Sequence, residues 1–165
     1  MLILHPNRDK AESKATKAAV VLLLLTSAAL IAIITAGGWS QLQGAQIVSF
    51  TYVILYLLFA YLVLNWNRGV LPVTAALAIL FAVVAGLAGP AWFDRDKSGF
   101  AEAALEPSIL GLLSLILVPV QILLILFAMR GFQQKWNVEL EVTRDEAERY
   151  SDDEPPRGEP APAAY

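Results

Sequence analysis

Residues 18–67 read AAVVLLLLTSAALIAIITAGGWSQLQGAQIVSFTYVILYLLFAYLVLNWN and contain no Lys, Arg, Asp, Glu or His. A helix needs about 20 apolar residues to cross a bilayer core, so this run of fifty residues is long enough for two crossings. The apolar pattern weakens only between Gly37 and Gln46, where glycines, glutamines and a tryptophan replace it. The stretch therefore predicts a membrane hairpin with helices at 18–36 and 45–64.

Two further apolar stretches follow, at residues 70–88 and 108–129. The first has Pro72 in its first turn, where a missing N–H costs little, and we expect it to stop at Gly89-Pro90. Hydrophobic residues make up 57% of the chain, above the share of roughly 45–50% that is usual in soluble domains. Together these features predict an all-α integral membrane protein with a four-transmembrane-helix bundle.

The basic residues near the ends of the spans predict the orientation, because cytoplasmic loops carry an excess of Lys and Arg. Two of them lie in the loop between the third and fourth spans, at Arg95 and Lys97. Eight lie on the other side: Arg8, Lys10, Lys14, Lys17, Arg68, Arg130, Lys135 and Arg144. We therefore expect both termini in the cytoplasm and the protein in the cell membrane, with residues 1–17 forming an uncleaved basic head.

Residues 130–165 are predicted to form a cytoplasmic interfacial segment and an acidic, Pro-rich tail. Val138 to Val142 alternates apolar and acidic residues, which favours a short strand only if a partner strand is present. Thr143 and Glu146 have the spacing of a capping box, which indicates the start of a short helix. From Ser151 onward, prolines and acids without a large apolar residue before Tyr165 predict disorder.

Several kinds of chemistry are excluded by composition. The chain has no cysteine, and its one histidine, His5, precedes the first span, so thiol chemistry and haem ligation between spans are excluded. No ionisable residue other than tyrosine lies inside the spans, whereas proton relays and cation pumps place charged groups there. We therefore expect no enzymatic activity, no cofactor and no nucleic-acid partner.

Polar residues near the middle of the spans form the candidate site: Thr26, Tyr52, Tyr56 and Gln121. The helical rise of about 1.5 Å per residue places Thr26, Tyr56 and Gln121 at similar depth. Hydrogen bonding between helices is the favoured interpretation of these residues. The alternative is a midplane pocket for a lipid-like or quinone-like ligand.

The second and third spans carry complementary patterns. Small residues recur at steps of three and four in the third span, and larger ones do so in the second. Because a short link makes the two helices antiparallel, residues whose numbers sum to 134 share a depth. The predicted pairs of large and small side chains are Ser49 with Ala85, Tyr52 with Ala82, Tyr56 with Ala78 and Phe59 with Ala75.

The loop after the third span begins like an EF-hand, with Asp94, Asp96 and Gly99 at calcium-loop spacing. The twelfth position is Leu105 instead of a bidentate Glu, and two basic residues dilute the negative charge. A solvated turn is therefore the favoured interpretation, and weak calcium binding is the alternative.

The leading functional hypothesis is a non-enzymatic accessory, assembly or scaffold subunit of a larger membrane complex. It depends on the uncharged spans, the complementary patterns and the acidic tail. Expected partners are membrane lipids and either a second membrane protein or another copy of this chain. The alternative function is a transporter or carrier of an apolar small molecule at the membrane midplane.

Overall fold

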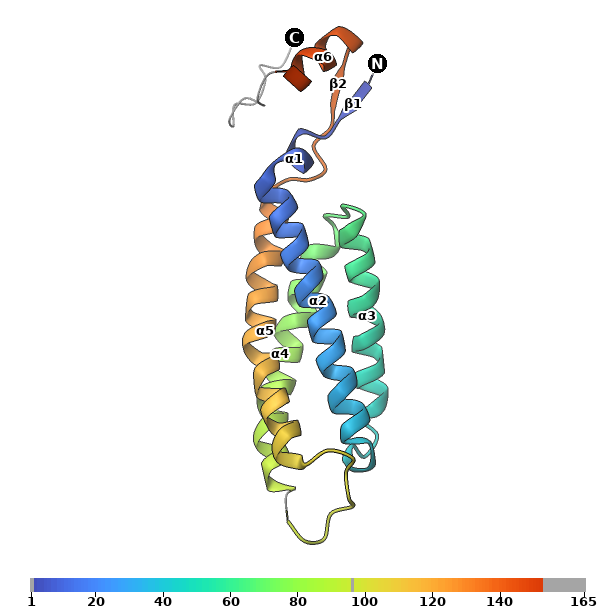
Figure 1. Ribbon diagram of the computed structural model, residues 1–165, viewed down its shortest axis with the longest axis vertical. Coiled ribbons are helices and arrows are strands. Elements are labelled where there is room, and N and C mark those ends of the chain that lie inside the picture. The colour runs from blue at the N-terminus through green and yellow to red at the C-terminus, as the bar shows by residue number, and fades with distance from the viewer. Residues whose placement is uncertain (1, 96, 153–165) are drawn as a thin grey trace.

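The computed structural model describes residues 2–95 and 97–152 of the chain. Four long helices form an antiparallel bundle, and each is long and apolar enough to cross a membrane. They are α2 (Ala11–Gly37), α3 (Gln46–Leu64), α4 (Val70–Asp94) and α5 (Pro107–Gln133). The four predicted helices are thus confirmed. The N-terminus and the C-terminal region lie beyond the same end of the bundle (Figure 1). We call this end the terminal end and the opposite end the loop end.

Helix α4 continues past the point where the sequence predicted its end. It runs through Pro90 to Asp94, so the predicted stop at Gly89-Pro90 is wrong. A proline removes one backbone hydrogen bond, but a membrane helix tolerates this loss where neighbouring groups hold the next turn. Trp92 holds this turn in place, since its side chain is buried and packs against Gly38 after α2.

The closest helix pair is α4 and α5, which meet through glycines. A Cβ added at Gly111 would lie 3.0 Å from the carbonyl oxygen of Gly89, so side chains larger than glycine would force the two backbones apart. Small residues allow such close approach in membrane helices, where van der Waals packing drives association. Gly86 and Gly89 of the third span therefore lie beside α5.

Helix α3 packs mainly on α2 and approaches α4 at few points. The predicted close packing of large α3 residues onto small α4 residues is therefore wrong. Aromatic rings bridge the space instead. Tyr52 and Tyr56 both contact the ring of Phe81, with ring centroids 4.5 Å and 6.4 Å apart.

A small sheet joins the two ends of the described chain. Strand β1 (Leu2–Leu4) pairs antiparallel with β2 (Leu140–Val142), with Ile3 opposite Glu141. The alternating segment before Thr143 has thus found the partner that its strand prediction required. Helix α1 (Pro6–Asp9) connects β1 to α2, and α6 (Arg144–Asp152) follows β2. The tail predicted to be disordered lies largely at residues 153–165, outside the described residues.

The predicted capping box is present at the start of α6. The carboxylate of Glu146 accepts hydrogen bonds from the backbone N–H and the hydroxyl of Thr143, each at 2.9 Å. These two bonds lower the pKa of Glu146 below its ordinary value. The short helix thus starts where the spacing predicted it.

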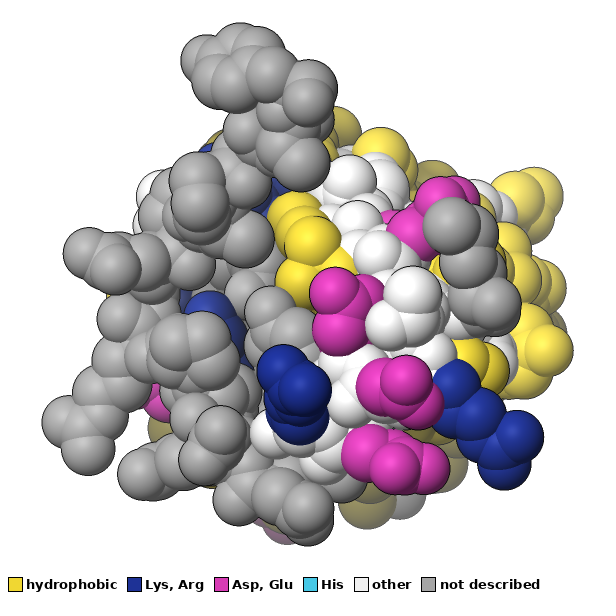
Figure 2. Space-filling model, turned by 90° about the horizontal axis from the view of Figure 1, so that it is seen from above, with side chains coloured by type: hydrophobic (Ala, Val, Ile, Leu, Met, Phe, Trp, Pro, Cys, Tyr) yellow, Lys and Arg dark blue, Asp and Glu magenta, His cyan; other side chains and the backbone are white. Residues whose placement is uncertain are grey.

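Basic side chains at the terminal end bind carbonyl groups at the ends of helices. Lys17 donates to the carbonyl of Leu64, the last residue of α3, at 3.2 Å. Arg68 donates to the carbonyl of Phe132 near the end of α5. Cations stabilise helix C-termini because the last carbonyls lack partners within the helix. Figure 2 views this end and shows acidic and basic side chains close together on it.

Candidate functional site

Three buried polar side chains from three helices are linked by hydrogen bonds at the middle of the bundle. We call this linked set, Tyr56, Gln121 and Ser27, the polar chain. The Tyr56 hydroxyl donates to Oε1 of Gln121 at 2.7 Å, and Nε2 of Gln121 donates to the Ser27 hydroxyl oxygen at 2.9 Å. All three side chains are fully buried. The predicted common depth of Tyr56 and Gln121 is therefore observed as a direct contact that ties α3 to α5 and α5 to α2.

The geometry of α2 explains why Ser27 joins this chain and Thr26 does not. Consecutive residues of an α-helix point in directions about 100° apart, because a turn contains 3.6 residues. The buried side of α2 includes Val20, Leu24, Ser27 and Ile31, and Thr26 is exposed on another side. The prediction that Thr26 shares a cluster with Tyr56 and Gln121 is corrected accordingly.

Tyr52 lies beside the polar chain without belonging to it. It is half-buried, its ring contacts Tyr56 edge-on with centroids 5.7 Å apart, and it also packs on Phe81. Its hydroxyl lies 3.5 Å from the carbonyl oxygen of Leu77, at the long limit for a hydrogen bond. Tyr52 thus acts mainly as an aromatic contact between α3 and α4.

A pocket of about 120 Å³ lies between the helices on the loop-end side of the polar chain. Its wall includes Ser49 of α3, Phe81 and Ala88 of α4, and residues of α2 and α5. The hydroxyls of Thr35 and Ser114 on this wall donate to carbonyls of their own helices, at 2.7 Å and 2.8 Å. The pocket therefore presents a mainly apolar surface, because the hydroxyls of Thr35 and Ser114 are already paired and most of the other wall residues are apolar.

The groups at these sites can form hydrogen bonds and apolar contacts. In residues 2–95 and 97–152, no group of three or more His, Asp or Glu side chains is arranged to hold a metal ion. In the EF-hand-like loop, the Asp94 carboxylate pairs with Lys97 at 3.4 Å, and Asp96 lies outside the described residues. The polar chain can hold helices together, and the pocket can accept an apolar group.

Sequence reasoning missed three residues that shape these sites: Ser27, Phe81 and Trp92. Ser27 could have been found from its seven-residue spacing to Val20 and Ile34, since residues seven apart share a helix face. No such spacing distinguishes Phe81, because its helix is almost wholly apolar. Trp92 was assigned to a loop because Pro90 was expected to end α4.

Comparison of the chain with known protein families, with curated proteins and with solved structures finds no match.

Proposed function

We propose that this protein is a non-enzymatic subunit of a membrane complex, which holds a transmembrane helix of a partner protein beside α3. One observation carries the proposal. In the most apolar part of α3 only 22% of the residues are buried inside the molecule, against 33–44% in the other long helices. Helix α3 therefore has the largest share of its residues left exposed to a further helix.

Apolar exposure alone does not drive association in lipid, so a partner helix must also be held by specific packing. Membrane helices associate through van der Waals packing and hydrogen bonds. The pocket beside α3 supplies a place for such packing, since Ser49, Ala85 and Ala88 on its wall are small. An apolar cavity of about 150 Å³ can hold a benzene molecule, so one large side chain of the partner would fit a pocket of 120 Å³.

A crosslinking experiment tests this proposal. A photoreactive amino acid would replace Val48, which is exposed on α3 beside the pocket. We expect one defined protein adduct in the native membrane, and we expect Ala88→Phe to abolish it by filling the pocket. Ala76→Phe is the matched control, because Ala76 is exposed on α4 outside the pocket wall. An adduct that survives Ala88→Phe would contradict the proposal.

The same apolar pocket supports a second candidate function, in which the protein carries a lipid-like or quinone-like molecule. The two candidates differ in what remains bound to the purified protein. Mass spectrometry after purification in mild detergent would find a stoichiometric protein partner in the first case. A stoichiometric lipid or quinone, displaced by Ala88→Phe, would favour the second.

The proposed orientation places the terminal end in the cytoplasm and the loop end outside the cell membrane. The excess of basic residues at the terminal end supports it. Single cysteines at Gln43, Ser98 and Ser151 would be labelled with an impermeant thiol reagent on intact cells, in this naturally cysteine-free chain. We expect labelling at the first two positions only, and labelling at Ser151 would reverse the orientation.

A further inference from the structure

Two lysines at the start of α2, Lys10 and Lys14, are left free by the rest of the described chain. Both are exposed, and within residues 2–95 and 97–152 neither side chain makes an ion pair or a hydrogen bond. Two cations near them are already engaged, since Arg8 donates to the carbonyl of Trp136 and Lys17 to that of Leu64. Lys10 and Lys14 are thus available to bind a group outside the chain.

The two lysines lie one helical turn apart on one side of α2. The backbone N–H of Lys14 donates to the carbonyl of Lys10 at 3.1 Å, which closes this first turn. Residues four apart share a side of a helix, whereas Glu12, the one acidic residue of α2, points about 160° away from Lys14. Asp9 belongs to α1 and pairs with neither lysine in the described structure. The two ammonium groups therefore add charge of one sign on this side of α2.

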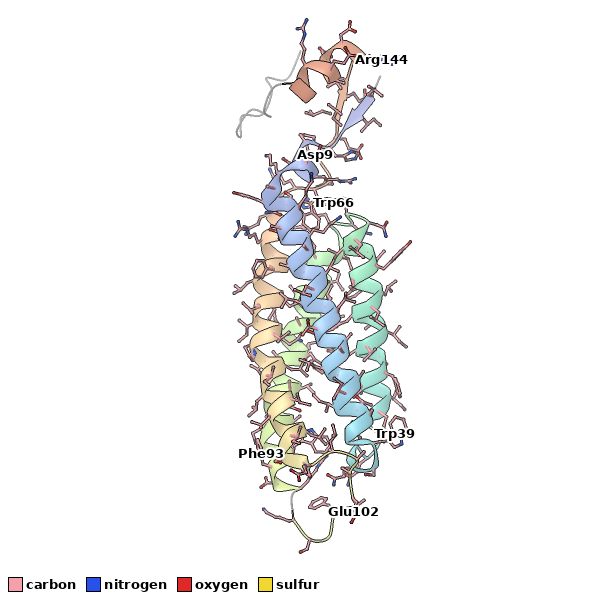
Figure 3. All side chains as sticks on the ribbon, in the orientation of Figure 1. Asp9, Trp39, Trp66, Phe93, Glu102 and Arg144 are labelled. Atoms are coloured by element: carbon pink, nitrogen blue, oxygen red, sulfur yellow. The ribbon has the colours of Figure 1, made fainter. Side chains whose placement is uncertain are left out.

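The bundle indicates the depth that these lysines would have in a membrane. Figure 3 shows Trp39 at the loop end and Trp66 at the terminal end, and tryptophans favour the level of the lipid head groups. Between these two residues α3 has 19 residues, which span about 28 Å and match a hydrocarbon core of about 30 Å. Leu64, the last residue of α3, would therefore lie at the boundary of the core on the terminal-end side.

On this scale Lys14 falls within the layer of lipid head groups. Lys17 donates to the carbonyl of Leu64, and its Nζ lies 4.0 Å from the centre of the Trp66 ring, so Lys17 marks the boundary of the core. Lys14 is about 4.5 Å further out, and the head-group layer is roughly 5–8 Å deep. Lys10 lies one turn beyond Lys14, where its charge still acts on the phosphates because the Debye length is about 8 Å at physiological ionic strength.

An apolar surface that is open to lipid continues from Lys14 toward the middle of the bundle. Ala18, one turn inward from Lys14, is exposed, and so are Leu22 and Leu25 on the same side of α2. A phospholipid has its parts in the same order, with an anionic phosphate at the head-group level and apolar chains below it. The side of α2 from Lys10 to Leu25 therefore matches a phospholipid in both charge and polarity.

We infer that this side of α2 binds an anionic phospholipid, with the phosphate against Lys14 and Lys10 and an acyl chain along Ala18 and Leu25. Ammonium groups form charge-assisted hydrogen bonds with phosphate, and each lysine near an anionic membrane surface strengthens binding about five-fold. A zwitterionic phospholipid gains less, because its own ammonium group offsets the charge of its phosphate. The inference goes beyond the proposed function, since it concerns the terminal end of α2 and needs no protein partner.

The experiment measures which lipids the full-length protein retains. Native mass spectrometry would release it from nanodiscs that contain equal amounts of phosphatidylglycerol, which is anionic, and phosphatidylcholine, which is zwitterionic. We expect the retained lipid to be enriched in phosphatidylglycerol, and Lys14→Gln should lower this enrichment about five-fold. Because Lys14 is exposed and unpaired in the described structure, its replacement should leave thermal unfolding unchanged. Equal retention of the two lipids by the natural protein would overturn the inference.

A matched variant separates a defined site from the effect of net charge. Arg130 is exposed near the end of α5 at the terminal end, and no Lys or Arg lies one turn from it in that helix. Arg130→Gln removes the same charge as Lys14→Gln and should change the enrichment little. Equal losses in the two variants would mean that total charge attracts the lipid, and would overturn the assignment to Lys14 and Lys10.

A crosslink locates the lipid on α2. A photoreactive amino acid at Ala18 should form an adduct with phosphatidylglycerol in the same nanodiscs, and Lys14→Gln should reduce that adduct about five-fold. Adding Ala15→Lys to Lys14→Gln restores the charge but moves it about 100° around the helix, so we expect no recovery. Full recovery of the adduct would show that the charge acts without a defined position, and would overturn the inference.

The acidic C-terminal segment is the competing occupant within the chain. Residues 153–165 include three acidic side chains, Asp153, Glu154 and Glu159. A chain truncated after Asp152 should retain phosphatidylglycerol as the full-length protein does. Enrichment that appears only after truncation would assign Lys10 and Lys14 to that segment, and would overturn the inference.

Discussion

Helices α5 and α3 both neighbour α4 in this bundle, but they meet it in opposite ways. Helix α5 approaches α4 so closely that a Cβ at Gly111 would meet backbone, whereas α3 stands off and reaches α4 through the rings of Tyr52 and Tyr56. The first contact has no room for larger side chains, and the second leaves a pocket beside it. Helices α4 and α5 thus form a tightly packed pair, whereas α3 has open space beside it.

The largest effect should come from overpacking the tightly packed pair, α4 and α5. In Gly111→Ala the new methyl group would lie 3.0 Å from the carbonyl oxygen of Gly89, and overpacking costs about 1–3 kcal/mol. Gly86→Ala is the matched control, because its methyl group would only touch Val118 at 3.9 Å. Both variants gain similar helix propensity, so reversible unfolding in bicelles should show Gly111→Ala less stable by about that amount. Equal stability would remove the distinction between the helix pairs.

A second test concerns the predicted register between α3 and α4. Ala78 is fully buried, so Ala78→Leu should destabilise the protein, by about 1–3 kcal/mol. Because α4 lies closest to α5, Tyr56→Ala should fail to rescue that loss, and the two changes should add within about 0.5 kcal/mol. Ala76→Leu, on the exposed side of α4, should be tolerated. Partial rescue in the double variant would restore the register deduced from sequence.

These comparisons also show what the sequence could and could not reveal. The four spans follow from length and the lack of charge, because a bilayer admits only helices that satisfy their own backbone groups. The neighbours of each helix do not follow. In spans this uniformly apolar there is no polar side to mark exposure, so the proximity of α4 to α5 could not be read from periodicity. Ser27 is the exception, because its seven-residue spacing to Val20 and Ile34 places it on their helix face.

For this reason the sequence predicted only part of the candidate site. Tyr56 and Gln121 stood out because polar groups are rare at that depth, and such groups seek one another in lipid. Thr26 stood out for the same reason but lies on an exposed side of α2.

A third test measures a direct polar link between α3 and α5. Tyr56→Phe keeps the ring and removes the hydroxyl that donates to Gln121. Hydrogen bonds between membrane helices contribute about 0.6 kcal/mol on average, with a maximum of about 1.7 kcal/mol. We expect a loss within that range in bicelle unfolding. Thr26→Val is the control and should leave stability unchanged, and an equal loss in both would mean that burial does not decide the effect.

The smallest effect should appear at α6, outside the membrane bundle. The pKa of Glu146 is lowered because its carboxylate accepts bonds from the backbone N–H and the hydroxyl of Thr143. A lowered pKa in the folded state means that the charged carboxylate stabilises the helix start above the unfolded pKa. That contribution is lost as the pH falls through the lowered folded value.

Amide signals of α6 in an NMR titration from pH 7 to pH 3 should therefore report fraying only in the acidic part of the range. Glu146→Gln keeps a side-chain oxygen acceptor but removes the titration, so its α6 signals should change less over the same range. Residues 70–93 and 107–133 should show no corresponding change in either protein away from their ends, because neither stretch contains an Asp or Glu. If the signals of Glu146→Gln moved as much as those of the natural protein, another group would control the start of α6, and the capping contact would be incidental.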